Sequence, residues 1–576
     1  MGVTRAVKTV ATLAALVVSA ALVLATPSSA VDAGGPDQRP VQRSQVSAMQ
    51  QVVDRMQPGW NLGNTFDATP GDETSWGNPR TTRELIAKVA DQGFHSIRIP
   101  ITWDQRTGAA PGYTVDPAFL DRIEQVVTWA LDEHMYVIIN MHHDSGWVRN
   151  MVTDHDAVLA KYSAIWTQVA ERFKNYPTTL LFEAINEPRF SDDWNADAPE
   201  YFAALNELNT TFHGIVRSSG GNNAQRPLVL STLTGSPSQA RLDQLHQTIT
   251  ALSDPNLIAT VHYYGYYPFS VNIAGGTRFD DVAEQDMLDA FDRAYNRFTA
   301  EGIPVIVGEY GLLGFDKFVG TIQQGEKLKY FEAIAHYAKV HDFALMLWDN
   351  GQHFDRRAYK WNDPDLYAMI KAGFAGRSST AASDSLYFVN GAPIDDVTVR
   401  LNLHGNRLDT IEVGATRLRP GRDFALSGEQ LTFKASFLRG VLNGDVGENA
   451  VVTAHFSRGA DWKFHLIGYE TPTLAGAEGT TSGFAVPTQF HGDSLATMEA
   501  TYPDGSNAGP ADWTAYKEFG ASFVPSYDTN EIKLTDTFFN EVRDGDVMLR
   551  FHFWSGSIVD YKLTKSGSTV TGALLP

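Results

Sequence analysis

The sequence of 576 residues contains no cysteine. Disulfide bonds, thiolate nucleophiles and cysteine-ligated metal centres are therefore excluded. A chain without disulfide bonds has to rely on large hydrophobic cores for its stability. The chain is also too long for a single core, so we expect about two to four domains.

Positive charge is scarce as well. The 46 Lys and Arg residues face 67 Asp and Glu residues, which gives a net charge of -21 at pH 7. A chain this acidic is not drawn by charge to nucleic acid or to an anionic membrane. We therefore expect a neutral partner. The alternative is that the negative charge serves only to keep the protein soluble. Aromatic residues are plentiful, with 12 Trp, 21 Tyr and 32 Phe, which predicts flat surfaces that stack on a ligand.

A long apolar run is present only near the N-terminus. Arg5 and Lys8 precede the run at 10–25, and the small residues Ser28 and Ala30 follow it. This order is typical of a secretory signal peptide over residues 1–30, and it predicts a secreted, extracellular protein. Residues 31–45 are polar and rich in Pro and Gly, and we expect them to form a flexible leader. No other stretch is long and apolar enough to span a bilayer.

Eight short apolar strands alternate with helical segments over residues 46–375. This alternation predicts a parallel sheet, and eight repeats of it predict a closed (β/α)8 TIM barrel. Continuously apolar strands fit burial on both faces of such a sheet. The strands are predicted at 58–62, 95–100, 135–140, 180–185, 227–231, 257–262, 304–309 and 344–348. Predicted helices include 81–92, 117–133, 156–175, 199–219, 282–301 and 325–341.

The C-terminal third of the chain has a different pattern. Residues 376–385 are small and polar, which indicates a linker. Alternating strands with Gly and Asn turns follow, and they predict a β-sandwich-like module over 386–470. A second, mostly-β module is predicted over 471–576.

Polar side chains gather where six of the predicted barrel strands end. Catalytic groups of a parallel barrel lie at the C-terminal ends of its strands, so these side chains are expected to converge on one face. They are Arg98, Asn140, His142, His143, Asp144, Asn186, Glu187, His262, Tyr263, Tyr264, Glu309, Tyr310, Trp348 and Asp349.

Glu187 and Glu309 form the central pair of this set. They are 122 residues apart, which places them on the fourth and seventh strands, across the barrel mouth from each other. Two facing carboxylates can cleave a glycosidic bond, one as proton donor and the other as nucleophile or base. Mutual repulsion and partial burial are expected to raise the pKa of the proton donor. Pro188 should bias Glu187 toward extended backbone and so fix its aim.

Seven motifs in this order resemble glycoside hydrolase family 5, in its endoglucanase and xyloglucanase-like branch. The resemblance spans roughly residues 50–375, and it implies a retaining mechanism on a (β/α)8 barrel. The motifs are "GWNLGNTFDA", "HSIRIPITW", "NMHHD", "FEAINEP", "VHYYGYY", "VIVGEYG" and "MLWDNG".

The resemblance implies a role for each catalytic residue. Glu187 would be the acid/base and Glu309 the nucleophile. Asn186 would hydrogen-bond the sugar 2-hydroxyl at the cleavage point. Arg98 would hold the nucleophile ionised, because its fixed guanidinium fork suits a carboxylate. A plain structural ion pair is the alternative for Arg98.

Supporting roles are also implied by the family. His142 would support the acid/base region, with the adjacent His143 as the alternative. His262 and Tyr264 would flank the nucleophile, with Tyr263 as the alternative to Tyr264. The sequence "HHD" could suggest a metal site, but adjacent side chains on a strand point to opposite faces, so no metal and no cofactor is expected.

Sugar contacts are expected from aromatic and amide side chains. Trp348 would be the floor on which a sugar ring stacks, because sugars present apolar C–H faces. Asn61, Asn64 and Asp67 follow the first strand, where this branch binds sugar. Other aromatic residues are each as easily core as ligand platform: Trp60, Trp76, Trp103, Trp147 and Tyr266.

The two tail modules resemble known companions of secreted cellulases. Residues 386–470 resemble an immunoglobulin-like module, and residues 471–576 resemble a carbohydrate-binding module of family 46. The second is similar to modules that fold back on the barrel and complete the cleft. Trp513 is the candidate aromatic that it offers to the glucan, with a core position as the alternative, and Trp554 is expected in the core.

These observations predict a retaining endo-β-1,4-glucanase. Its partners would be β-glucan polysaccharides, namely cellulose, mixed-linkage glucan and xyloglucan, and we expect a monomer. A β-1,4-mannanase on the same scaffold is the first alternative, because the catalytic residues do not report the configuration of the sugar 2-hydroxyl. A non-catalytic carbohydrate-binding protein is the second, but such a protein would be expected to lack one of the two glutamates.

Overall fold

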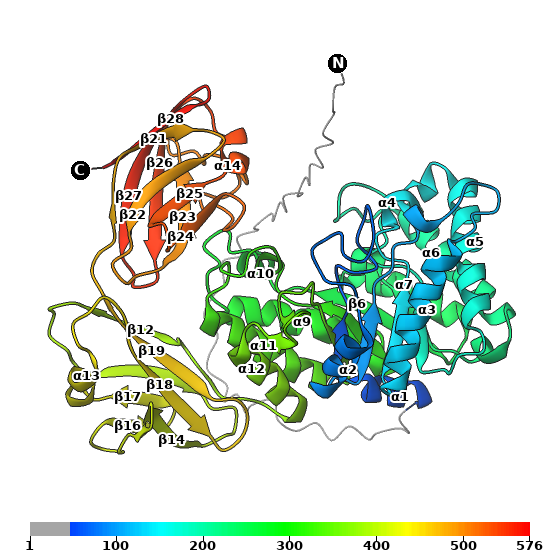
Figure 1. Cartoon of the computed structure of the whole chain (residues 1–576), viewed down its shortest axis with the longest axis horizontal. Helices are drawn as coiled ribbons and strands as arrows, with labels where there is room; N and C mark the ends of the chain where they lie inside the picture. Colours follow the sequence, from blue (N-terminus) through cyan, green and yellow to red (C-terminus); the bar gives the residue numbers. More distant parts are fainter. Residues whose placement is uncertain (1–46, 576) are drawn as a thin grey trace, which may run out of the picture.

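The computed structural model describes residues 47–575. The predicted signal peptide, 1–30, and the predicted leader, 31–45, lie outside the described residues. Within 47–575, no helix has both the length and the apolar character needed to cross a membrane. Figure 1 shows three parts in chain order: a helix-wrapped barrel in blue to green, a β module in yellow and a β module in orange to red.

The first part is the predicted barrel, and the predicted fold class is confirmed. Eight parallel strands close in sequential order from β1 to β8. Each predicted strand is observed within two residues of its expected ends. The strands are β1 Gly59–Asn61, β2 Ser96–Ile99, β3 Tyr136–Asn140, β4 Leu180–Glu183, β5 Leu228–Ser231, β6 Leu257–Tyr263, β7 Val305–Tyr310 and β8 Ala344–Leu347.

Helices cover the outside of this barrel, and their caps follow from the local sequence. Asp116 caps α3 by accepting from the backbone of Ala118, with Pro117 in the first turn. Asp280 caps α9 through two backbone amides in the same way. The longer helices are α1 Ala48–Met56, α2 Arg83–Asp91, α3 Pro117–Asp132, α5 His155–Phe173, α6 Pro199–Ser218, α7 Gln239–Leu252, α9 Asp281–Arg297, α11 Gln324–Val340 and α12 Pro364–Ala375. Short helices are α4 Ser145–Val148, α8 Tyr267–Ser270 and α10 Leu313–Lys317.

The interior of the barrel is apolar at one end and polar at the other. Helix α1 closes the N-terminal end, where Met49, Val53 and Met56 pack on strand residues such as Ile138 and Ile306. This plug is a dry layer of side chains. Further along the same strands, the buried residues are Asn61, Arg98, Glu183 and Glu309. The polar groups therefore face the opposite, C-terminal end of the barrel.

The second and third parts are two-layer β-sandwiches. The middle module pairs a four-stranded sheet, β11-β13-β17-β16, with a five-stranded sheet, β12-β19-β18-β14-β15. Its elements are β11 Thr380–Ala381, β12 Ser385–Val389, β13 Val397–Asn402, β14 Leu408–Val413, β15 Thr416–Arg417, β16 Phe424–Ser427, β17 Gln430–Phe433, α13 Ala435–Val441, β18 Gly447–Phe456 and β19 Trp462–Tyr469.

The terminal module repeats this plan. It pairs β20-β22-β25-β24 with β21-β28-β27-β26-β23, and its short helix again follows the corresponding strand. Its elements are β20 Thr473–Leu474, β21 Ala477–Thr480, β22 Phe484–Gln489, β23 Leu495–Thr501, β24 Phe523–Ser526, β25 Glu531–Leu534, α14 Asp536–Asn540, β26 Gly545–Phe553, β27 Ile558–Ser566 and β28 Thr569–Leu574. One difference stands out: the segment 502–522 between β23 and β24 is about twice as long as its counterpart, 414–423, in the middle module. We call residues 502–522 the docking loop.

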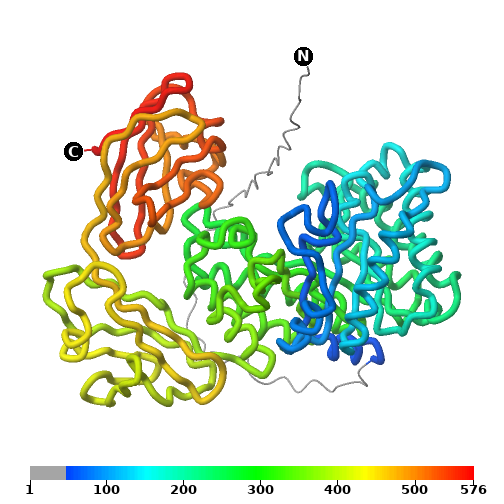
Figure 2. The backbone as a smooth tube through the Cα atoms, in the orientation of Figure 1, coloured from blue at the N-terminus to red at the C-terminus, as the bar shows by residue number. Residues whose placement is uncertain are grey.

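The docking loop carries most of the contacts between the terminal module and the barrel. Phe519 donates its backbone N–H to the carbonyl of Asn272 over 3.2 Å, and its ring packs on Phe318. Glu518 lies 3.6 Å from the Lys317 ammonium group. Figure 2 shows the terminal module standing beside the green part of the barrel, where α10 lies. The hydrophobic core of the terminal module is separate, and Phe318 is the barrel residue that packs on it.

The middle module is joined to the barrel more closely. Buried residues of both, from Trp60 to Leu466, form one continuous hydrophobic cluster. The predicted linker at 376–385 is correspondingly not a free tether. Ser378, Ser379 and Thr380 are buried, and β11 begins at Thr380. The small side chains of Ser378, Ser379 and Thr380 allow close packing between the modules.

Candidate active site

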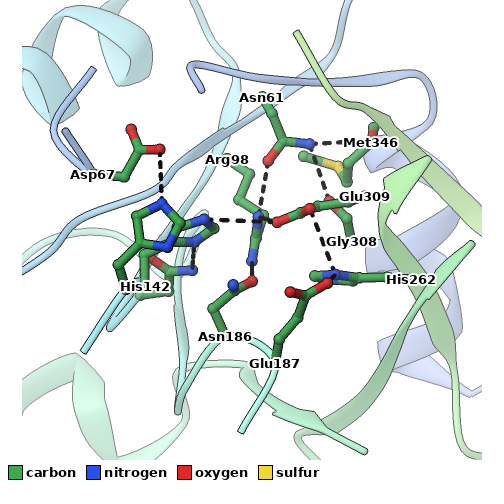
Figure 3. A network of polar contacts seen from close by, with 12 residues as sticks. Asn61, Asp67, Arg98, His142, Asn186, Glu187, His262, Gly308, Glu309 and Met346 are labelled. Atoms are coloured by element: carbon green, nitrogen blue, oxygen red, sulfur yellow. Dashed lines mark hydrogen bonds and ion pairs between the residues drawn. The ribbon is translucent and has the colours of Figure 1, made fainter. Parts of the chain in front are cut away.

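Arg98 on β2 is the centre of the polar network at the C-terminal end of the barrel (Figure 3). It is fully buried, and its guanidinium group donates to four different side chains. The Nη1 atom donates to Glu309 over 2.7 Å and to Asn61 over 3.0 Å. The Nε and Nη2 atoms donate to Glu183 over 2.6 and 2.8 Å, and Nη2 also reaches Asn186 over 2.6 Å. One cation therefore fixes residues from β1, β4, β7 and the turn after β4.

Glu309 receives hydrogen bonds from several sides. Besides Arg98, the Tyr264 hydroxyl donates to its Oε2 over 2.6 Å. His262 Nδ1 lies 3.6 Å from the same oxygen, and His142 Nε2 lies 3.9 Å from Oε1. The register of β6 against β7 shifts between Val261 and His262, so that His262 pairs with Glu309. Such a bulge re-aims side chains, and here it brings the imidazole to the carboxylate.

Glu187 is more accessible than Glu309, because its side chain is 25% exposed whereas that of Glu309 is 6% exposed. His262 Nδ1 lies 2.9 Å from Glu187 Oε1, so the same ring nitrogen approaches both glutamates. A carboxylate oxygen of each glutamate and a nitrogen of His262 all lie within 4.8 Å of one another. The predicted pair is thus brought together at the barrel mouth.

The backbone of Glu187 differs from the prediction. Its φ is +41°, which is left-handed rather than extended. The following proline was expected to enforce an extended conformation, and that expectation was wrong. Hydrogen bonds to other segments fix this turn. Asn186 donates its backbone N–H to the carbonyl of Met141, and Thr234 donates its backbone N–H to the carbonyl of Pro188. A strained residue that is fixed by its surroundings is common at functional sites.

The two buried histidines of the site, His142 and His262, have pKa values shifted in opposite directions. Burial lowers the pKa of His262, but the neighbouring carboxylates of Glu309 and Glu187 outweigh it, so the pKa is raised. Burial lowers the pKa of His142 well below its ordinary value, and the nearby positive groups His143 and Arg98 act in the same direction. His142 is therefore a neutral ring, and His262 is the imidazole that carries charge more readily.

The two adjacent histidines are both near the site, but in different positions. His142 is buried, stacks on Trp348 with an angle of 3° between the rings, and faces Glu309 instead of the acid/base region. His143 is exposed to solvent and lies 3.6 Å from Asp67 and beside Trp76. The expectation that they point to opposite faces was wrong, since β3 ends at Asn140 and the two rings contact each other edge to face.

Two groups of donors in the described residues are close enough to hold a metal ion. They are Asp67 with His142 and His143, and Glu187 with His262 and Glu309. Asp67 already accepts the backbone N–H groups of Asn64 and Thr65. The second group contains the two carboxylates themselves. The donors are engaged within the protein, so we assign no ion to either group.

The two adjacent tyrosines are clearly distinguished. The hydroxyl of Tyr264 bonds to Glu309, and burial together with that carboxylate raises the pKa of Tyr264 well above its usual value. Its proton is therefore retained for donation. The hydroxyl of Tyr263 donates to Asp286 over 2.8 Å, and its ring packs on Phe291. Tyr263 thus lies outside the network around Glu309.

Trp348 lies partly exposed at the end of β8, as expected for a sugar platform. A Cβ atom on residue 63 would lie 2.9 Å from the Trp348 ring, so Gly63 permits this ring position. Asn61 does not present its amide to a sugar. It is fully buried, donates to the carbonyls of Gly308 and Met346, and accepts from Arg98. Asn61 is therefore a support for Arg98, and its expected role in direct sugar contact was wrong.

The remaining aromatic candidates divide into core and surface. Trp60 and Trp103 are buried core residues. Trp76 and Trp513 are each 40% exposed, so Trp513 is not a core residue. The expected core position of Trp554 was wrong: this residue is half-buried, and Arg278 of the barrel lies 5.0 Å from its ring centre. Trp554 is therefore at the boundary between modules.

Sequence reasoning missed two acidic residues near the site. Glu183 is the last residue of β4 and shares Arg98 with Glu309. A single charged residue in an otherwise apolar strand was the available signal. Asp316 on α10 accepts a hydrogen bond from Gln352, and burial raises its pKa well above the usual range, with Glu309 acting in the same direction. Nothing in the local sequence of α10 places that carboxyl group near the barrel mouth.

Comparisons with known proteins agree with this geometry. Residues 61–354 match the cellulase family, glycosyl hydrolase family 5. Residues 381–466 match the carbohydrate-binding domain X2, and residues 470–573 match the carbohydrate-binding domain of family 46.

Some relatives match almost the whole chain, and others match the barrel alone. The chain is 54% identical over 559 residues to endoglucanase B of Paenibacillus lautus, covering 96% of this chain and 97% of that one. The structure of the full-length tri-modular endo-β-1,4-glucanase B from Bacillus halodurans superimposes with a TM-score of 0.90 at 55% identity, over 92% of this chain and 99% of that one. A tri-modular subfamily 4 endo-β-1,4-glucanase from Bacillus licheniformis, complexed with cellotetraose, gives a TM-score of 0.77 at 29% identity, over 92% and 100% of the two chains. The chain belongs to glycoside hydrolase family 5, as a tri-modular endo-β-1,4-glucanase of subfamily 4.

Proposed function

We propose that this endoglucanase cleaves internal β-1,4-glucosidic bonds with retention, by double displacement. The observation that carries the proposal is the spacing of the two glutamates, which have carboxylate oxygens within 4.8 Å of each other. Retaining glycosidases have their carboxyl groups about 5 to 5.5 Å apart, whereas inverting enzymes leave a wider gap for a water molecule. Glu309 is the nucleophile, and Glu187 is the acid/base.

The first step forms a covalent intermediate. Glu309 attacks the anomeric carbon, the bond to the glycosidic oxygen breaks, and Glu187 gives its proton to that oxygen. Two donors support this assignment of Glu309, because Arg98 holds one of its oxygens in place and Tyr264 holds the other. The greater exposure of Glu187 suits a group that meets first the leaving sugar and then water.

The second step reverses the proton transfer. Glu187, now a carboxylate, takes a proton from a water molecule, whose oxygen attacks the same carbon. The ester to Glu309 breaks, and the product keeps the β configuration. His262 faces both glutamates, so its imidazole can interact with whichever carboxylate is charged in each step. Asn186 holds its oxygen toward Arg98, so its amide N–H₂ group is free to meet the sugar 2-hydroxyl.

The tail is proposed to extend the cleft toward mixed-linkage glucan and xyloglucan. The docking loop contacts Asn272 and Lys317, in the segments that follow β6 and β7, and these strands carry His262 and Glu309. The same loop carries the exposed Trp513. A platform on this loop would contact a long substrate beyond the barrel itself.

Hydrolysis assays test both parts of the proposal. The proteins are the full chain, Glu309→Gln, Trp513→Ala and a truncation after residue 470. The substrates are carboxymethyl-cellulose, barley β-glucan, xyloglucan and galactomannan. We expect Glu309→Gln to lose at least 10³-fold in kcat, as for loss of a covalent nucleophile. Trp513→Ala and the truncation should selectively weaken cleavage of the soluble β-glucan or xyloglucan.

Four results would contradict the proposal or part of it. An active Glu309→Gln variant would remove the nucleophile assignment, and inverted anomers in proton NMR of fresh products would remove retention. Unchanged activity of the truncation on all soluble substrates would make the tail an anchor only. Preference for galactomannan would favour a β-mannanase specificity instead.

Secretion is proposed from the N-terminal sequence. The charged start, the apolar run at 10–25 and the small residues before Val31 support export with removal of residues 1–30. Expression in a secreting bacterial host should give a culture-fluid protein whose first residue is Val31. Retention of the protein inside the cells, with residue 1 intact, would contradict this.

A further inference from the structure

A cavity of about 650 Å³ lies where the three modules meet. The barrel contributes Asn272, Gln324 and Asp363, the middle module contributes Tyr387, and the terminal module contributes Tyr527 and Trp554. None of the residues of the network around Arg98 lines it. Its volume falls within the usual range for small-molecule sites. The cavity is therefore separate from the catalytic site and depends on all three modules.

Three partly exposed aromatic residues from the two tail modules line this space. Tyr387 lies on β12, and Tyr527 and Trp554 belong to the terminal module, next to β24 and β26. Tyr387 and Trp554 are half-buried, and Tyr527 is 47% exposed. Rings that are neither buried in a core nor fully solvated can stack on the apolar C–H face of a sugar.

The charged groups in the wall are already paired with groups of the protein. Asp363 lies 2.7 Å from the Lys327 ammonium group, and Asp365 lies 2.7 Å from that of Lys463. Glu448 is 2.6 Å from His465. Carboxylates outnumber cations in the wall, so an anionic ligand is disfavoured, whereas hydroxyl groups find many acceptors.

One buried acceptor in the wall has no partner. Asn272 is 3% exposed, and its Oδ1 accepts no hydrogen bond from any residue that the structure describes. Its amide nitrogen donates to the carbonyl of Ala496 in the terminal module over 2.9 Å, which fixes the orientation of the oxygen. An unsatisfied buried acceptor costs free energy, and a hydroxyl donor in the cavity would remove that cost.

We propose that the cavity is a second carbohydrate site, which binds a short neutral cello-oligosaccharide, a product of the barrel's own reaction. The occupant stacks on Trp554 and Tyr387 and places a hydroxyl near Asn272. Because the terminal module has its own core and meets the barrel mainly through the docking loop, such a ligand also ties the three modules together. This site goes beyond the cleavage reaction proposed above.

Calorimetric titration of the full chain with cellotriose tests the site. Glu309→Gln is used as the background so that the ligand stays intact, which is checked by chromatography. We expect two binding sites per chain. Ser494→Trp, which fills the cavity without removing a wall ring, should abolish one site and leave the other within about twofold.

Ring removal gives a second, independent variant. Trp554→Ala should weaken the cavity site by about tenfold, and Tyr387→Ala should act in the same way. Tyr387→Phe keeps the ring and is the matched control, in which both sites should persist. Trigalacturonate, the anionic probe, should not bind to the cavity.

Several outcomes would overturn the proposal. These are a single site in the Glu309→Gln background, two sites in Ser494→Trp, or binding of trigalacturonate that Ser494→Trp removes. Degradation of cellotriose by Glu309→Gln would count against the proposed nucleophile only. In that case, the titration is repeated with Glu187→Gln, so failure of the two proposals is distinguishable.

Discussion

Arg98 and Glu183 form a fully buried, two-point ion pair inside the barrel. The Arg98 Nε and Nη2 atoms donate to the two carboxylate oxygens of Glu183 over 2.6 and 2.8 Å. Burial alone would lower the pKa of Arg98, but Glu183 and Glu309 raise it, so the guanidinium group stays charged. Glu183 thus occupies one edge of the guanidinium fork and leaves the other for Glu309, Asn61 and Asn186. The position of the Glu309 carboxylate therefore depends, through Arg98, on a second carboxylate that is itself buried.

Glu183→Gln tests this dependence. The substitution removes one charge of a buried pair and places the new amide N–H₂ group against an N–H donor of Arg98. We therefore expect a loss of about 3 kcal/mol in the free energy of unfolding. The guanidinium group should also shift, with a fall in kcat/KM of about 10²-fold. Denaturant unfolding and steady-state kinetics on barley β-glucan measure the two effects. Lys327→Gln, another change to a buried ion pair, is the control that should lower stability with unchanged kcat.

Tyr264→Phe and Tyr263→Phe form a matched pair. Removing the Tyr264 hydroxyl deletes a hydrogen bond to Glu309, and hydrogen bonds to charged groups are worth about 1.5 to 3 kcal/mol, so kcat/KM should fall by about 10- to 100-fold. Removing the Tyr263 hydroxyl leaves Asp286 without that donor, so the free energy of unfolding should fall while kcat/KM remains unchanged. Equal kinetic effects in the two variants would contradict the separation of their roles.

The barrel could be predicted because its signals are local. Strands such as 135–140 and 257–262 are continuously apolar, which follows directly from burial on both faces. The polar residues at the strand ends could also be read directly from the sequence. Their convergence on one face could then be predicted, because the barrel topology alone brings the C-terminal ends of the strands together. The roles of Glu187 and Glu309 stay predictions, although the structure places both carboxylates beside the same nitrogen of His262.

What could not be predicted depends on contacts between distant segments. The left-handed backbone of Glu187 is set by bonds to Met141 and Thr234, which override the local influence of Pro188. Asn61 was expected to contact a sugar. Its amide nitrogen instead donates to three backbone carbonyl groups, and its amide oxygen accepts from Arg98. The choice between His142 and His143 likewise required the position of Trp348. Local sequence carries no information about such partners.

His353 makes stability depend on pH. Its ring is fully buried against Phe315 and Phe331, neither nitrogen has a partner within the described part of the chain, and burial lowers its pKa from 6.5 to about 4. Between these values the unfolded state binds a proton that the folded state does not. The free energy of unfolding therefore falls as pH drops through this window, by at most about 3 kcal/mol from this group.

His353→Phe should remove this part of the acid sensitivity. Phenylalanine fills a similar volume among aromatic neighbours and has no nitrogen to satisfy. We expect the variant to gain stability relative to the natural protein at pH 4.5, by more than at pH 7.5. Thermal unfolding at both pH values, with a nonbinding buffer, measures the difference. An identical pH dependence in the two proteins would show that His353 is not the titrating group.

Two truncations should differ in their effect on the barrel. Removal of residues 471–576 takes away a module with its own core, and the barrel residue packed on that core is Phe318, so the barrel should keep its melting temperature within about 2 °C. Removal of residues 376–576 cuts through the continuous cluster that includes Ala381 and Leu386, and it deprives the buried Glu332 of Arg377. This longer truncation should lower stability by several kcal/mol and promote aggregation. Calorimetry and light scattering on both proteins separate the cases. Equal melting temperatures for the two would mean that the middle module stabilises the barrel no more than the terminal module does.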